Sequence, residues 1–242
     1  MNALIPLYFF ITVTSIYIIL RIYLIKTGTD ETTIGNSNNI YTYIYIFVIL
    51  IGNFSINKKI SQEYTSEIEV SNLNILFVTL IPWVFIFGSL FILLSVFTSW
   101  VKPFSNTIGY LFVQLLGINS IYDTIFKTDV NAEQEIKMKE LLITLKTNKI
   151  ILINEMSSDI DNFKHFIFEL INSKFTNIKL DKIQHETKLT DIKFSLDNKE
   201  QTLLDLYKII IIKDEIGKFI WFILAGMLIT TIVFNTIQSI TS

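Results

Sequence analysis

Cysteine is absent from the 242-residue chain, and arginine, histidine and proline are scarce. Without cysteine the chain forms no disulfide and holds no zinc ion or iron–sulfur cluster through sulfur ligands. The two histidines, His165 and His185, are isolated, and neither has a second ligand at metal-binding spacing. His165 also falls off the apolar face of its expected helix, which indicates a solvated side chain. We therefore expect no metal-binding residues and no cofactor.

The sequence also lacks the short motifs that carry common catalytic chemistry. It contains no dinucleotide-binding glycine pattern, P-loop, nucleophile elbow or HExxH zinc motif. Catalysis would then depend on carboxylates alone, and acidic residues such as Glu133 and Glu135 stand four residues before lysines, as on solvated helix faces. We predict that the protein is not an enzyme and has no catalytic residues. A membrane-tethered enzyme would need a pocket of converging carboxylates within residues 123–215.

Charge is missing from long stretches of the chain, although it has 42 charged residues and a net charge of −2. The charge-free stretches are residues 1–20, 32–57, 70–101, 103–122 and 219–242. By contrast, 32 of the charged residues lie between positions 123 and 218. About 20 apolar helical residues cross ~30 Å of hydrocarbon, so this segregation predicts an integral membrane protein with one soluble domain. Because lysines and acids alternate, we expect no nucleic-acid partner.

Four apolar segments are predicted to cross the membrane. They cover residues 4–25, 40–56, 73–98 and 216–242. The first lacks a basic region and a small-residue cleavage site, which argues against a signal peptide, and Arg21 at its end is expected to snorkel to the interface. The second is short, so an interfacial segment is its alternative. In the third apolar run we expect a kink at Pro82, with Trp83 and Trp100 at headgroup level.

The stretch 103–121 is apolar but too polar to be counted as a span. Ser105 or Asn106 is expected to cap a helix after Pro103, and apolar residues then recur at helical spacing. Two glycines, Gly109 and Gly117, would let another helix approach closely. We predict an interfacial or re-entrant segment, with a plain amphipathic connector as the alternative. It completes an N-terminal membrane region that covers residues 1–122.

Residues 123–215 are predicted to form a small α/β domain inserted before the last span. Its expected helices are residues 131–146 and a helix that begins at a capping box of Ser158 and Asp161; its expected strands are residues 149–153, 177–180 and 191–196. Asn198 is expected to begin a helix that runs on through the last span. The predicted fold class is thus an α-helical membrane protein with about four transmembrane helices and a small α/β domain.

The connections between the spans bear on orientation and packing. Residues 57–72 are expected to be a charged connector. More lysines and arginines flank the side of the soluble domain than the side of the termini, so the positive-inside rule predicts a cytosolic domain with both termini across the membrane. Uncharged polar residues on apolar helices are expected to form helix–helix contacts; these are Thr79, Ser89, Asn106 and Gln114.

Two stretches together are similar to a known family. The first contains Pro103, Phe104, Ser105, Asn106, Thr107, Gly109 and Tyr110, and the second contains Lys213, Asp214, Ile216, Gly217 and Trp221. They resemble the membrane and minor-capsid-type virion proteins of nucleocytoplasmic large DNA viruses of algae and protists. The two stretches cover about a fifth of the chain.

The resemblance implies a structural virion protein anchored in the internal membrane beneath an icosahedral shell. Its partners would be the lipid bilayer, capsid proteins and other virion membrane proteins, with further copies of the chain as another candidate. During assembly the protein would reside in host endomembranes. The alternative is a small viral channel or transporter in the membranes of the infected cell, although the charge-free core of the last span, residues 219–238, and the other three spans contain no charged residue except Arg21.

Overall fold

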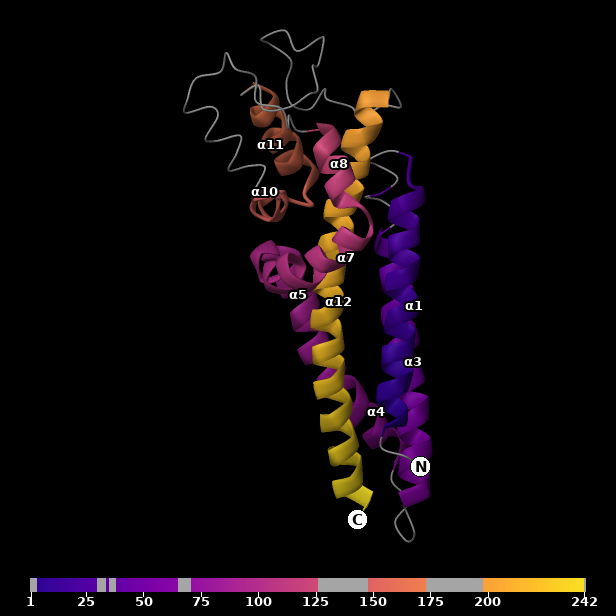
Figure 1. Cartoon of the computed structure of the whole chain (residues 1–242). Helices are drawn as coiled ribbons and strands as arrows, with labels where there is room; N and C mark the ends of the chain where they lie inside the picture. The colour runs from indigo at the N-terminus through magenta and orange to yellow at the C-terminus, as the bar shows by residue number, and fades with distance from the viewer. Residues whose placement is uncertain are drawn as a thin grey trace, which may run out of the picture. The chain divides into compact units, whose positions relative to one another are not determined.

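The computed structural model describes residues 4–29, 34, 38–64, 71–125, 148–172 and 198–241, and this part of the chain is helical and contains no strand. Its long helices are α1 (Ile5–Thr27), α3 (Asn38–Tyr64) and α12 (Asn198–Thr241) (Figure 1). A further long helix consists of α4 (Asn72–Pro82), the π-helical turn η1 (Trp83–Phe87) and α5 (Gly88–Val96).

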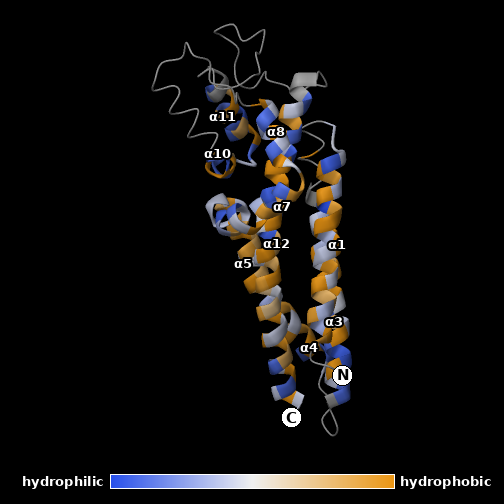
Figure 2. Cartoon of the chain, in the orientation of Figure 1, coloured by the Kyte–Doolittle hydropathy of each residue, from blue (hydrophilic) through white to orange (hydrophobic). Residues whose placement is uncertain are grey.

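Four of these helical segments are long and apolar enough to cross a membrane, by length and composition: Ile5–Thr27, Ile40–Glu63, Asn72–Val96 and Gln201–Thr241. This confirms the prediction of about four helices of transmembrane character. In Figure 2 the hydrophobic colour runs along much of each long helix, and hydrophilic residues gather towards the ends of α1 and α3. Helix α3 is longer than the second predicted span. It continues through residues 57–64, where a charged connector was expected.

The chain divides into two compact units. The first consists of Met1–Leu24, Asn36–Phe104 and Glu215–Ser242, and the second of Ile25–Gly35 and Ser105–Asp214. Helix α12 contributes its first part to the second unit and its remainder to the first. It is continuous from Asn198 to Thr241, as the sequence predicted.

Aromatic side chains dominate the core of the first unit. Phe10 of α1 packs against Trp83 and Phe87 with ring centroids 5.3 and 6.4 Å apart, and Phe222 of α12 lies 5.1 Å from Phe87. Trp83 is only 3% exposed, so the prediction that it lies at headgroup level is wrong. Pro82, which has no N–H to donate, immediately precedes the π-helical turn, and departure from α-helical hydrogen bonding is expected there.

Uncharged polar side chains link the helices of the first unit. The Thr14 and Tyr45 hydroxyls lie 3.0 Å apart, and the Asn57 amide donates to the Thr79 hydroxyl over 3.1 Å. In lipid such bonds hold helices together, because the hydrocarbon contains no water that could hydrogen-bond an unpaired polar group. The predicted helix contact of Thr79 is thereby confirmed. Ser89, by contrast, is exposed on α5.

The stretch 103–121 is a chain of short helices. These are α6 (Lys102–Phe104), the π-helical turn η3 (Ser105–Gly109), α7 (Tyr110–Leu115) and the start of α8 (Ile118–Ile125), after the 3₁₀ turn η2 (Thr98–Trp100). The helical structure begins before Ser105 and Asn106, with Pro103 in the first turn, so neither residue caps it. Gly117 has a φ of +87° and joins α7 to α8, which is a different role from the helix contact predicted for it.

The predicted α/β domain requires two corrections. Residues 149–153 lie in α10 (Lys149–Glu155), not in a strand: the helix satisfies its own backbone groups and buries Ile153 completely. Helix α11 (Ile160–Asn172) is capped by Asp159, whose carboxylate accepts from the Asn162 amide at 3.0 Å, and not by Ser158. The other predicted elements of this domain, residues 131–146, 177–180 and 191–196, lie outside the described residues, as does His185.

Candidate functional site

A buried ion pair joins the first and last long helices of the first unit. The Arg21 guanidinium reaches Glu215 with Nε 3.4 Å from Oε2 and Nη2 3.3 Å from Oε1. Arg21 is 3% exposed and Glu215 is 7% exposed, so both charges are removed from solvent. Arg21 is therefore covered by the protein, and its side chain does not snorkel out to solvent as predicted. Removing one partner of such a pair leaves an uncompensated buried charge.

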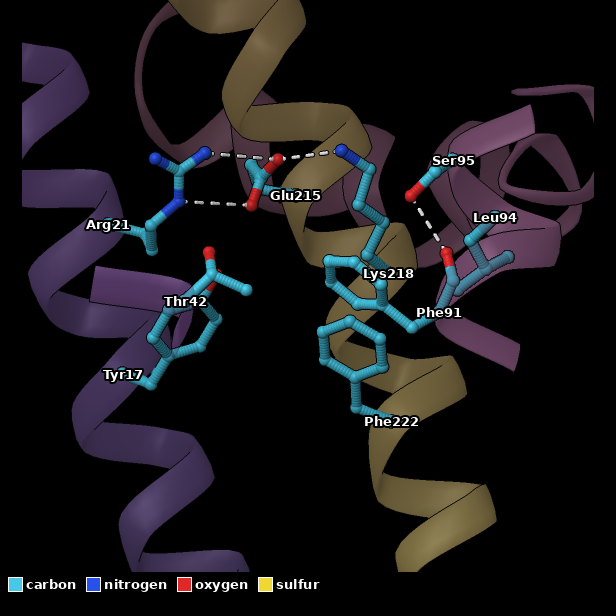
Figure 3. A pocket seen from close by; sticks show the side chains of 9 residues that line it. All are labelled: Tyr17, Arg21, Thr42, Phe91, Leu94, Ser95, Glu215, Lys218 and Phe222. Carbon is cyan, nitrogen blue, oxygen red and sulfur yellow. Dashed lines mark hydrogen bonds and ion pairs between the residues drawn. The ribbon is translucent and has the colours of Figure 1, made fainter. Parts of the chain in front are cut away.

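A second cation completes the cluster. The Lys218 ammonium lies 2.8 Å from Oε1 of Glu215, one helical turn away on α12. Figure 3 shows Arg21 and Lys218 on either side of the Glu215 carboxylate. The cluster contains two positive charges and one negative charge. Nη1 of Arg21 is buried and has no hydrogen-bond partner among the described residues.

The three charged groups line a cavity of about 170 Å³. Its other lining residues are Tyr17, Thr42, Phe91, Leu94, Ser95 and Phe222. The Tyr17 and Thr42 hydroxyls lie 2.9 Å apart, and the Ser95 hydroxyl donates to the Phe91 carbonyl over 2.8 Å. In Figure 3 the aromatic side chains lie to one side of the ionic groups, so the cavity has an ionic end and an aromatic end.

The cavity lies near one end of α1, α3 and α5, beside the point where the charge-free part of α12 begins. Arg21 is near the end of α1, Thr42 near the start of α3, Ser95 near the end of α5, and Lys218 directly before the charge-free stretch 219–242. Residues 219–241 form about 35 Å of helix, enough to cross ~30 Å of hydrocarbon. The charged groups therefore lie where the charge-free stretch of α12 begins.

A second polar cluster lies in the second unit. Lys213 of α12 is 1% exposed, and its ammonium donates to Asn106 Oδ1 over 3.0 Å and to the Ile153 carbonyl over 3.2 Å. The Ser105 hydroxyl donates to the Asp214 carboxylate. Residues from the two stretches that carry the family resemblance are therefore in direct contact. This network buries one lysine and ties η3 and α10 to α12.

Gly109 makes close contact between η3 and α12 possible, as the sequence predicted for it. A Cβ added at this position would overlap with the backbone carbonyl oxygen of Lys213. Of the two other polar residues expected at helix contacts, Asn106 forms such a contact and Gln114 does not. Asn106 accepts from Lys213, whereas Gln114 is exposed and donates to Tyr110 within its own helix at 3.1 Å.

Of the two histidines considered as metal ligands, His165 lies within the described residues. The His165 side chain is 58% exposed and its Nδ1 lies 3.6 Å from Glu169 on the same helix face, which places it in solvent as predicted. Within the described ranges, no group of three or more His, Cys, Asp or Glu side chains is placed to hold a metal ion.

Glu215 is the site residue that sequence reasoning missed. It was counted as the last residue of the soluble domain, and a partner 194 residues away is invisible in a sequence pattern. A signal did exist, because four spans place the end of the first and the start of the last on the same side. An acid three residues before Lys218 then faces the same interface as Arg21.

Comparison of the chain with protein-family profiles, curated protein sequences and solved structures finds no match. Functional conclusions therefore rest on the residues of this chain.

Proposed function

We propose that this chain is an integral membrane protein with a structural role, which anchors itself in a bilayer and binds neighbouring proteins. The observation that carries the proposal is the outward face of the four long helices. It presents large apolar side chains, among them Ile16, Ile19, Tyr23, Phe47, Phe85 and Ile92, each more than 60% exposed. In water such a surface would drive aggregation, whereas lipid solvates it.

The interior of the first unit supports anchoring rather than catalysis. Aromatic rings such as Phe10 and Phe87 fill the space between the helices, and uncharged pairs such as Asn57 with Thr79 fix their register. The exposed apolar area suits lipid or the apolar helices of a partner protein. A second copy of the chain would suit the same surface.

A narrower proposal concerns the membrane in which the protein resides. The resemblance to virion proteins of large DNA viruses supports a location in an internal virion membrane, bound to capsid or other membrane proteins, with host endomembranes as the location during assembly. The contacts of Ser105 with Asp214 and of Asn106 with Lys213 support this proposal, because the two similar stretches act as one structural element.

Two measurements test the role at its two levels. Alkaline carbonate extraction of membranes that contain the full chain should leave it in the pellet, and detergent should release it; release by carbonate alone would contradict membrane integration. Mass spectrometry of purified particles of the source virus, fractionated with detergent, should find the chain with the internal membrane. Absence from the particle would contradict the virion role but not membrane integration.

A channel or transporter is the second candidate, and the buried cluster of Arg21, Glu215 and Lys218 is the observation that favours it. Ionisable groups buried between membrane helices often mark ion or proton paths. Liposomes that contain the purified chain would then conduct ions or protons, and Glu215→Gln would change that flux. Liposomes no leakier than protein-free controls would exclude this candidate.

A further inference from the structure

The cavity lined by Arg21, Glu215 and Lys218 has an unbalanced charge. Of the residues that line it, Arg21 and Lys218 are cationic and Glu215 alone is anionic. Glu215 contacts both cations, and its single charge neutralises one of them. Arg21 and Glu215 are buried, whereas the Lys218 side chain is 35% exposed. An anion that enters the cavity would therefore meet a net positive charge of one.

The donors present suit an oxyanion. Arg21 keeps a buried Nη1 with no hydrogen-bond partner among the described residues, in addition to the two nitrogens that face Glu215. A guanidinium presents its N–H groups in a planar fork that matches phosphate and carboxylate oxygens.

The size of the cavity limits the ligand to a small group. A volume of about 170 Å³ corresponds to roughly six water molecules at about 30 Å³ each, below the range of about 300 Å³ and more typical of drug-sized ligands. A phosphate group with its attached oxygens fits this space, whereas a whole lipid or nucleotide does not.

The surroundings of the cavity indicate what is attached to that group. Beside the lining residues Leu94 and Ser95, the outward face of α5 carries Ile92 and Val96, which are 64% and 65% exposed. The lining itself contributes Phe91 and Phe222. Lipid phosphates lie at the membrane–water interface, and basic pockets between membrane helices bind anionic headgroups. Arg21 and Lys218 directly border the charge-free stretches 1–20 and 219–242, as residues at such an interface would.

We propose that this cavity binds the phosphate group of an anionic phospholipid, with Arg21 and Lys218 as the cationic ligands. Glu215 holds the two cations in place and limits the net attraction to one charge. The acyl chains lie outside the cavity along the exposed apolar face of α5. A zwitterionic headgroup brings no net charge, so it does not balance the site.

The test uses the purified full chain in a neutral detergent and measures thermal unfolding against added ligand. The probes are a short-chain phosphatidic acid, the matching phosphatidylcholine and inorganic phosphate. Phosphatidic acid should raise the unfolding temperature in a saturable manner, and phosphatidylcholine should not. If inorganic phosphate has the same effect at the same concentration, the anion site stands but its ligand is a soluble phosphate; a much weaker effect of phosphate identifies the lipid.

Lys218→Met is the decisive variant, because the Lys218 side chain is 35% exposed and its loss leaves the Arg21–Glu215 pair intact. Loss of one charge-assisted contact should weaken phosphatidic acid binding about tenfold. Lys102→Met is the matched control, since Lys102 is exposed and does not line the cavity. Arg21→Gln, where it folds, should abolish the selectivity. Equal stabilisation by both lipids, or unchanged affinity of Lys218→Met, overturns the proposal.

Discussion

The Ser105 hydroxyl donates a hydrogen bond to the carboxylate of Asp214, which is 109 residues away in the sequence. Ser105 is fully buried, and its neighbour Asn106 accepts from Lys213, the residue before Asp214. Two consecutive residues of η3 thus bind two consecutive residues of α12. This pairing fixes the position of η3 against α12 within the second unit.

Ser105→Ala should lower the free energy of unfolding by about 2 kcal/mol, because a carboxylate loses a buried donor. Chemical unfolding in detergent micelles, followed by circular dichroism, measures the change. Ser89→Ala is the matched control, since Ser89 is an exposed serine on a helix, and it should change stability by less than about 0.5 kcal/mol. Equal effects of the two substitutions would show that the Asp214 contact contributes nothing.

Glu215→Gln should lower the free energy of unfolding more than Ser105→Ala does, because it leaves the buried Arg21 without its buried counter-charge. Breaking a buried pair in this way lowers stability by about 3 kcal/mol or more. Glu155→Gln, a change at an exposed residue of α10, is the control. The double variant Arg21→Met with Glu215→Met should recover much of the loss, because it removes both charges together. A double variant no more stable than Glu215→Gln would argue against direct coupling of the two residues.

Gly109→Ala should lower the free energy of unfolding by about 2 kcal/mol, the usual range for overpacking. The added Cβ meets the backbone carbonyl of Lys213, which cannot rotate away as a side chain does. Gly88→Ala tests the same exchange at a helical glycine with no atom within 4 Å of the new Cβ. It should be neutral or stabilising by up to about 1 kcal/mol, since alanine favours a helix. Similar losses at both positions would contradict the close contact.

Asp159→Ala should destabilise α11 by about 1 kcal/mol, because it removes the side chain that accepts from the Asn162 amide. Hydrogen–deuterium exchange at that amide should become faster. Asp161→Ala, two residues further on, removes an acid from the first turn but not this hydrogen bond, so exchange at Asn162 should change little. Faster exchange in Asp161→Ala only would support the capping box predicted from the sequence.

The membrane helices could be predicted from the sequence, because a charge-free stretch of membrane length is a local feature that does not depend on residues elsewhere in the chain. The same reasoning predicted the continuous helix from Asn198, and it assigned Thr79 and Gly109 to helix contacts. Each of these predictions depends on residues close together in the chain. The end of α3 was missed because Lys58 and Lys59 were read as the start of a connector, although lysines at a helix end can extend to the interface.

Features that depend on distant residues were not predictable. Nothing near Trp83 indicates that Phe10 of α1 packs against it, and aromatic residues favour both the interface and the interior. The apolar run 149–153 suits a buried strand and a short helix equally, since periodicity does not separate them over so few residues. Glu215 was assigned to the soluble domain because only the fold brings Arg21 to it.

The π-helical turn at Trp83–Phe87 accommodates one residue more than an α-helical turn would. Deleting one residue there would restore regular α-helical geometry and leave α5 facing as it does now. A deletion at the start of α5 itself would instead rotate the residues that follow by about 100° around the helix axis. Leu94, now 3% exposed, would then leave the core. The loss of a single codon is therefore accommodated at Trp83–Phe87 but misaligns the helix when it falls within α5.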